Sequence, residues 1–147
     1  VWMDSIAAIS GDKDAGRRSL WDHLDAALAQ QNLYASKNGG AKAPMTIVVI
    51  VYNLPDRDCA AYASAGQLLQ VGDPRDSSSV PSNGFQTYEQ QYITPIVNAI
   101  SDPKYASLRI VTMLEPDSFP NMITNTNDPT ASQNGISPNA NFPDTLA

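Results

Sequence analysis

Two runs of apolar, largely β-branched residues constrain the fold of this chain more than any other feature. They span residues 46–52 (TIVVIVY) and 108–114 (LRIVTML). The first run is continuously apolar rather than alternating, which is typical of a strand buried on both faces of a parallel sheet. The second run is interpreted in the same way. Residues 1–3 (VWM) resemble the end of a further strand.

Helical patterns separate these strands. An apolar stripe predicts a helix over about residues 15–31, with Asp14 as its N-cap and His23 as a partly exposed residue within it. The stripe consists of Leu20, Trp21, Leu24, Ala27 and Leu28. The alternation of strands and helices predicts right-handed crossovers and a parallel sheet or barrel.

A second helix is predicted over about residues 85–100. Tyr88, Tyr92, Ile96 and Ile100 lie on one side of it, and Pro95 is expected to kink it. Residues 71–84 have the composition of a loop, and the chain from Asn125 onward is rich in Asn, Pro, Thr and Ser. With no closing element in sight, we interpret the chain as a piece of a larger α/β barrel.

Composition narrows the class of protein. The chain has 147 residues, 42% of them hydrophobic, which is enough for one domain with a core. A net charge of -6 disfavours nucleic acid as a partner. No apolar run approaches the roughly 20 residues that cross a bilayer, so no membrane contact is expected. The low content of charged residues, 16%, suits a secreted protein.

Carboxylates follow each of the two strong strands within a few residues. Asp56 and Asp58 come shortly after Tyr52, and Glu115 and Asp117 follow residue 114. Neighbouring parallel strands lie about 4.8 Å apart and end at one rim of a sheet or barrel. Two carboxyl groups held close together cannot both ionise freely, so one keeps its proton. A protonated acid beside an ionised one is the pair that glycosidic cleavage needs.

Other roles for these acids compete with catalysis. Acidic residues in loops are commonly solvated or cap helices. Clustered carboxylates also bind Ca²⁺, but no Asp-x-Asp-x-Asp-Gly loop occurs, and we expect no metal. A nucleotide-binding domain is disfavoured because no Gly-x-Gly-x-x-Gly motif follows a strand.

Three segments resemble glycoside hydrolase family 6, the family of cellobiohydrolases and endoglucanases. They are VVIVYNLPDRDCAAYASAG (residues 48–66), LRIVTMLEPDSFPNMITN (108–125) and VWMDSIAAI (1–9). The resemblance implies an incomplete, distorted (β/α) barrel with parallel strands, in which residues 1–147 form the N-terminal portion of a single catalytic domain. It implies inverting hydrolysis of β-1,4-glucosidic bonds in cellulose by a secreted monomer without a cofactor.

The resemblance also assigns residues. It makes Asp117 the general acid and Asp58 the second catalytic carboxylate. Tyr52 matches a tyrosine that crowds the sugar at the cleavage subsite, and Ser64 matches a serine that holds water. Trp2 and Asp4 match residues that line a glucose subsite. Without the resemblance, Tyr52 is better interpreted as a core residue at a strand end, and Trp2 is a core candidate as well. Asp56 and Arg57 are candidates for a structural ion pair. Glu115 remains open between a carboxylate supporting the site and a buried structural partner.

Cys59 is the single cysteine of the chain. The count alone leaves it open between a buried thiol and half of a disulfide. The resemblance implies a disulfide to a cysteine outside residues 1–147, which requires an oxidising compartment.

The mode of attack on cellulose depends on loops. Residues 71–84 and 125–147 are long enough to roof a cleft, which favours a cellobiohydrolase over an endoglucanase of the same family. A non-catalytic cellulose-binding protein on this fold is the alternative of a different class. Because the family's later functional residues are missing, we expect residues 1–147 alone to be inactive and poorly folded.

Overall fold

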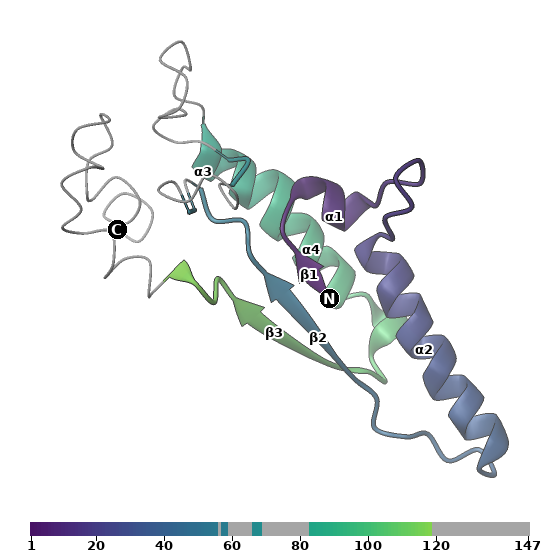
Figure 1. Cartoon of the computed structure of the whole chain (residues 1–147). Coiled ribbons are helices and arrows are strands. Elements are labelled where there is room, and N and C mark those ends of the chain that lie inside the picture. The colour runs from purple at the N-terminus through teal and green to yellow at the C-terminus, as the bar shows by residue number, and fades with distance from the viewer. Residues whose placement is uncertain (56, 59–65, 69–82, 119–147) are drawn as a thin grey trace.

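The computed structural model describes residues 1–55, 57–58, 66–68 and 83–118. Three strands form one sheet in the order β1-β2-β3: β1 (Trp2–Met3), β2 (Thr46–Val51) and β3 (Arg109–Leu114). Both pairings are parallel (Figure 1). The predicted parallel sheet and the alternation of strands and helices are therefore confirmed.

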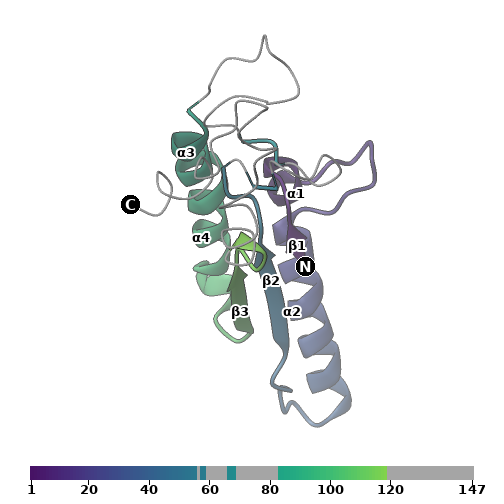
Figure 2. The ribbon, with the colours of Figure 1, turned by 60° about the vertical axis from the view of Figure 1, so that its left-hand side comes forward.

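The register of the sheet brings the three strand ends together. Val51 pairs with Met3 on one side and with Leu114 on the other. Figure 2 shows β2 and β3 running side by side in the same direction, toward the end of the molecule where α3 lies. The segments after all three strands therefore begin at one rim, as the sequence predicted.

The first long helix begins later than predicted. Helix α1 (Ile6–Ser10), which the sequence did not predict, is followed by α2 (Leu20–Lys37). Ser19, not Asp14, caps α2: its Oγ accepts from the Asp22 amide at 3.0 Å, and an Asp22 carboxylate oxygen accepts from the Ser19 amide at 2.8 Å. This reciprocal capping box satisfies two amides at once. Asp14 lies in the preceding turn, where its amide donates to Asp12.

The second predicted helix is confirmed, with an irregular centre. It consists of α3 (Gly84–Thr87), a π-helical segment η1 (Tyr88–Ile93) and α4 (Thr94–Ile100), followed by a 3₁₀ turn η2 (Pro103–Tyr105). Pro95 lies in the first turn of α4. Because the helix continues from η1 through Pro95, the missing N–H of the proline removes one hydrogen bond from the ladder directly after η1.

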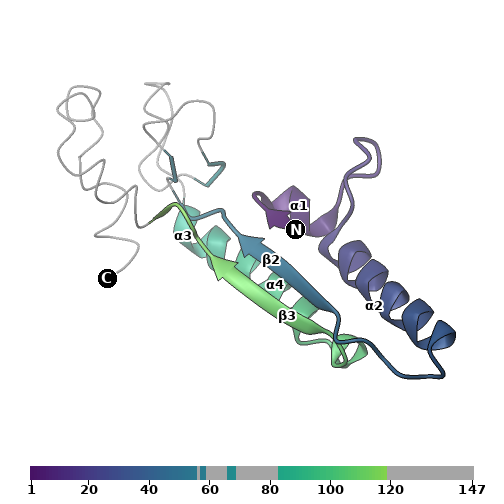
Figure 3. The same ribbon diagram turned by 60° about the horizontal axis from the view of Figure 1, so that its bottom comes forward.

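The core lies between the sheet and helices α2 and α4. Figures 1 and 3 show α4 behind the strands and α2 beside them. The buried cluster includes Met3, Leu20, Leu24, Val49, Val51, Tyr92, Ile96 and Ala99. His23 is half-buried on α2, as predicted. None of the described helices is long and apolar enough to cross a membrane.

The opposite face of the sheet is open, which corrects the prediction that both strong strands are buried on both faces. Val48 pairs with Val111, and Ile50 pairs with Met113, so these side chains share one face. Val48 is 40% exposed, Val111 49% and Met113 48%. The physical reason is that the described helices pack only on the face that carries Val49 and Val51.

Candidate active site

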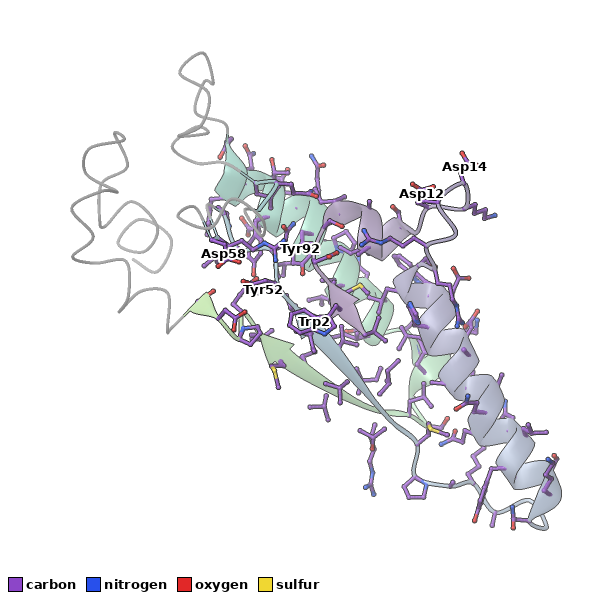
Figure 4. The ribbon with its side chains drawn as sticks, in the orientation of Figure 1. Trp2, Asp12, Asp14, Tyr52, Asp58 and Tyr92 are labelled. Carbon is purple, nitrogen blue, oxygen red and sulfur yellow. The ribbon has the colours of Figure 1, made fainter. Side chains whose placement is uncertain are left out.

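Tyr52 lies at the centre of the rim formed by the strand ends. It follows the last residue of β2, and its side chain is buried. Its hydroxyl donates to Oδ2 of Asp58 at 2.6 Å. The indole of Trp2 meets its ring edge-on, with the ring centroids 5.7 Å apart and an interplanar angle of 83°. Figure 4 shows Trp2, Tyr52 and Asp58 gathered at this end of the sheet.

Asp58 bonds to the Tyr52 hydroxyl, and several causes raise the pKa of this phenol. Burial is the main cause that raises the pKa of the Tyr52 phenol, followed by the hydrogen bond to Asp58 and then by the negative charges of Asp58 and Asp117. Asp117 is exposed and Asp58 is half-buried. The strands that precede the two loops end side by side, with Val51 paired to Leu114, so both loops begin at one rim. That Asp58 and Asp117 act together stays a prediction.

The backbone is unusual at both acid-bearing loops. Asp58 has a φ of 52° and Glu115 a φ of 42°, and within the described residues no other non-glycine residue has a positive φ. Left-handed backbone is costly for residues with a Cβ and persists where surrounding contacts hold it. Asp58 is itself a candidate catalytic group, and Glu115 stands two positions before Asp117.

Arg57 supports Tyr52 and the end of β1. Its guanidinium carbon lies 4.2 Å from the centre of the Tyr52 ring. Its Nη2 donates to the backbone oxygen of Asp4 at 3.0 Å. The predicted ion pair with Asp56 falls outside the described residues. Arg57 thus contributes a cation–π contact and a link between two strand ends.

Trp2 and Asp4, the candidate sugar contacts, occupy the β1 side of the rim. Trp2 is 53% exposed, so it is not a core residue of the described chain. Asp4 accepts from Arg17 at 3.3 Å and from the Ser5 hydroxyl at 3.2 Å. An exposed indole beside a fixed carboxylate offers a flat apolar surface and hydrogen-bond acceptors to a pyranose ring.

Three residues that sequence reasoning did not assign connect the strand ends beneath the rim. The buried Tyr92 hydroxyl donates to the backbone oxygen of Met3 and accepts from the Tyr52 amide at 2.8 Å. The Tyr88 hydroxyl donates to Oε1 of Glu115 at 2.9 Å. The Asn53 amide donates to the same oxygen at 3.0 Å. The signal available in the sequence was the tyrosine pair four residues apart on the helix before the acid-bearing strand.

Two predicted site residues, Ser64 and Cys59, lie outside the described residues. The roles assigned to them, a water contact and a disulfide, stay predictions.

Comparison with known proteins places these features in a family. The sequence profile of glycosyl hydrolases family 6 matches residues 1–140. Exoglucanase A of Cellulomonas fimi is 38% identical over 133 residues, which cover 90% of this chain and 13% of that protein. The 1,4-β-D-glucan cellobiohydrolase CEL6B of Podospora anserina is 34% identical over 129 residues, covering 88% of this chain and 24% of that protein.

Solved structures agree with the sequence matches. The catalytic domain of Cellulomonas fimi Cel6B superimposes with a TM-score of 0.68 at 38% identity, over 92% of this chain and 26% of that one. The CcCel6A catalytic domain, solved with p-nitrophenyl β-D-cellotrioside, gives a TM-score of 0.58 at 27% identity, over 94% and 31% of the two chains. The chain therefore spans about a quarter to a third of these catalytic domains and has the fold of that part.

Proposed function

Because the chain belongs to glycosyl hydrolases family 6, we propose that the protein containing it hydrolyses β-1,4-glucosidic bonds of cellulose with inversion at the anomeric carbon. The observation that carries the proposal is the hydrogen bond from the Tyr52 hydroxyl to Asp58, at the rim where the strand preceding Asp117 also ends. We propose that the two carboxylates, which follow neighbouring strand ends, face the same glycosidic bond, as glycosidic cleavage requires.

The proposed reaction divides the work between the two aspartates. Asp117 gives its proton to the glycosidic oxygen as the bond from that oxygen to the anomeric carbon breaks. A water attacks the anomeric carbon from the opposite face, and its proton leaves toward Asp58 through a relay that includes Ser64. Inversion requires room for this water, which is why the acting carboxyl groups of such enzymes stand roughly 6.5–9.5 Å apart.

Tyr52, Trp2 and Asp4 are proposed to hold the glucan. Tyr52 is fixed by Asp58, Arg57 and Trp2, so its ring forms a rigid wall at the cleavage subsite. A rigid wall favours a sugar ring distorted toward the transition state. Trp2 is exposed and offers its face to the next glucose toward the non-reducing end, with Asp4 beside it.

The names of the relatives favour exo action. The two proteins described above are an exoglucanase and a cellobiohydrolase, so we propose release of cellobiose from chain ends. An endoglucanase of the same family is the second candidate. A cellulose-binding protein without turnover is the third, and the presence of both aspartates speaks against it.

Residues 1–147 are proposed to be the N-terminal portion of one catalytic domain. The open sheet face carrying Val48, Val111 and Met113 supports this, because an apolar face of this kind is normally covered in a complete domain. We further propose a secreted monomer in which Cys59 forms a disulfide with a cysteine from another part of the protein.

The test uses the complete protein. Proton NMR during hydrolysis of a soluble cello-oligosaccharide should show the α-anomer as the first product, and a β-anomer would contradict inversion. Soluble sugar released from carboxymethylcellulose with little loss of viscosity supports exo action, whereas a rapid loss of viscosity supports the endoglucanase. Binding to cellulose without any product would favour the binding protein. Residues 1–147 expressed alone should give no product.

A further inference from the structure

Glu115 connects three elements beneath the rim. Its Oε1 accepts from the Tyr88 hydroxyl at 2.9 Å and from the Asn53 amide at 3.0 Å. Its own amide donates to the backbone oxygen of Val51 at 2.7 Å. The residue therefore links η1, the segment just after β2 and the start of the loop that carries Asp117.

The same residue shapes the turn around Asp117. Glu115 adopts a φ of 42°, and its backbone oxygen accepts from the Ser118 amide at 3.0 Å. Asp117 lies inside this closed turn. The Glu115 side chain accepts from the amide of Asn53, the residue directly after Tyr52. A shift of the Glu115 side chain would therefore move the supports of both Asp117 and Tyr52.

Stability alone does not account for a carboxyl group at this position. Burial raises the pKa of the Glu115 carboxyl, and its hydrogen bonds and the charge of Arg57 only partly oppose that effect. Among the described residues, its buried Oε2 has no hydrogen-bond partner, and neither has the side-chain amide of the fully buried Asn53. Unpaired buried polar atoms destabilise a fold, and an apolar side chain would avoid that cost.

Tyr88 is a suitable partner for such a group. Burial, and next the charge of Glu115, raise the pKa of the Tyr88 phenol, so its hydroxyl keeps the proton that it donates. Its ring stacks on that of Tyr92, with the centroids 5.3 Å apart and an interplanar angle of 26°. Tyr92 in turn bonds to the Tyr52 amide and to β1.

We infer that Tyr88 and Glu115 are a positioning pair for hydrolysis, which holds the Asp117 turn and the Tyr52 segment in their reacting arrangement. Neither residue touches the substrate; both act through the backbone of the two loops. The inference rests on the proposed function and adds to it two residues from outside the acid pair.

Kinetics of the complete protein test the pair. Tyr88→Phe keeps the stacked ring and removes only the hydroxyl, while Glu115→Ala removes the acceptor. Each should lower kcat by roughly 10- to 100-fold with KM within about twofold, because misplacing reacting groups by about 1 Å costs up to 10²-fold. Glu115→Gln retains an acceptor oxygen and should recover part of the loss. The double variant Tyr88→Phe/Glu115→Ala should be no slower than the slower single variant.

Matched controls separate positioning from general damage. Tyr34→Phe and Glu89→Gln make comparable changes at exposed residues and should leave kcat unchanged. The inference is overturned if Tyr88→Phe leaves kcat intact. It is equally overturned if kcat falls in proportion to the folded fraction, or if the two single losses multiply in the double variant.

Amide hydrogen exchange gives a readout that does not depend on turnover. Tyr88→Phe should speed exchange at Asn53, Glu115 and Ser118, whereas Tyr34→Phe should not. If the wild-type protein cuts no glucan but Tyr88→Phe still speeds exchange at these three amides, the proposed function fails and the structural pairing stands. If exchange at these amides is unchanged in Tyr88→Phe, the pairing itself is wrong.

Discussion

The hydroxyl of Tyr52 donates a 2.6 Å hydrogen bond to Oδ2 of Asp58. The bond joins two residues six positions apart, one just after β2 and the other the first candidate catalytic carboxylate. Tyr52 also feels the charge of Asp117 from the neighbouring strand. The phenol thus lies at the rim where both acid-bearing loops begin.

Replacing Asp117 with Asn should remove the proton donor. A positioned general acid contributes roughly 10²–10⁴-fold in rate, and we expect kcat to fall by this factor while the affinity for a cello-oligosaccharide is retained. Initial rates and isothermal titration calorimetry in the complete protein measure the two effects. Asp14→Asn is the control, because Asp14 lies on the turn before α2, away from the rim (Figure 4). Full activity in Asp117→Asn would exclude this residue as the acid.

Tyr52→Phe should slow turnover without unfolding the protein. The change removes a hydrogen bond to a carboxylate, an interaction worth about 1.5–3 kcal/mol. Without this bond Asp58 loses a fixed neighbour, and because misplacing a reacting group by about 1 Å costs up to 10²-fold, we expect kcat to fall by roughly 10- to 100-fold. Because the pKa of Tyr52 is raised, its hydroxyl stays protonated through the neutral range, and no loss of wild-type activity there should trace to its ionisation. Tyr34→Phe should behave as wild type. A change in KM alone would assign Tyr52 to binding.

Ser19→Ala should destabilise the start of α2. The variant loses the oxygen that accepts from the Asp22 amide, and loss of such a cap costs about 1 kcal/mol. Urea unfolding followed by circular dichroism measures the difference in unfolding free energy. Ser36→Ala, near the exposed C-terminal end of α2, is the matched control and should change stability much less. Equal effects of the two variants would show that the capping box is not important.

The stability of the protein should depend on pH through Glu115. Its folded-state pKa lies above the unfolded value, because burial disfavours the charged form. The contribution of the protonated group is full below the unfolded carboxyl pKa of about 4.3 and is lost as pH rises through the higher folded pKa. Wild type should therefore lose stability relative to Glu115→Gln as pH rises from about 4 to 7.

Urea midpoints at several pH values measure this difference. Glu89→Gln, which changes an exposed glutamate, should show no comparable trend. If the difference in urea midpoint between wild type and Glu115→Gln does not change with pH, Glu115 ionises alike in the folded and unfolded chains.

The sheet and its rim were predictable because they depend on local patterns. A continuous β-branched run such as residues 46–52 indicates a parallel strand, and parallel strands end at a common edge. The positions of Asp58 and Asp117 directly after two such strands then place both acids at that edge. Their roles came from the family resemblance and not from the spacing.

Features that depend on distant partners were not predictable. Asp14 and Ser19 are both acceptable N-caps, and the choice is made by Asp22, which completes the capping box only from Ser19. The hydroxyls of Tyr88 and Tyr92 bond to Glu115, just after β3, and to Met3 of β1, both far away in the sequence. The open face at Val111 depends on which elements cover the sheet, and the apolar run itself carries no information about that.

The π-helical segment η1 (Tyr88–Ile93) holds one residue more in its wide turn than an ordinary helical turn does, because its hydrogen bonds span five residues instead of four. Losing one codon inside this stretch would convert the wide turn into a regular one, and the helix on either side would keep its relative rotation. Losing one codon in the regular part Thr94–Ile100 would instead turn everything before it by about 100° and move Tyr88 and Tyr92 away from their partners. The helix should therefore accept a one-residue deletion within η1 more readily than one within α4.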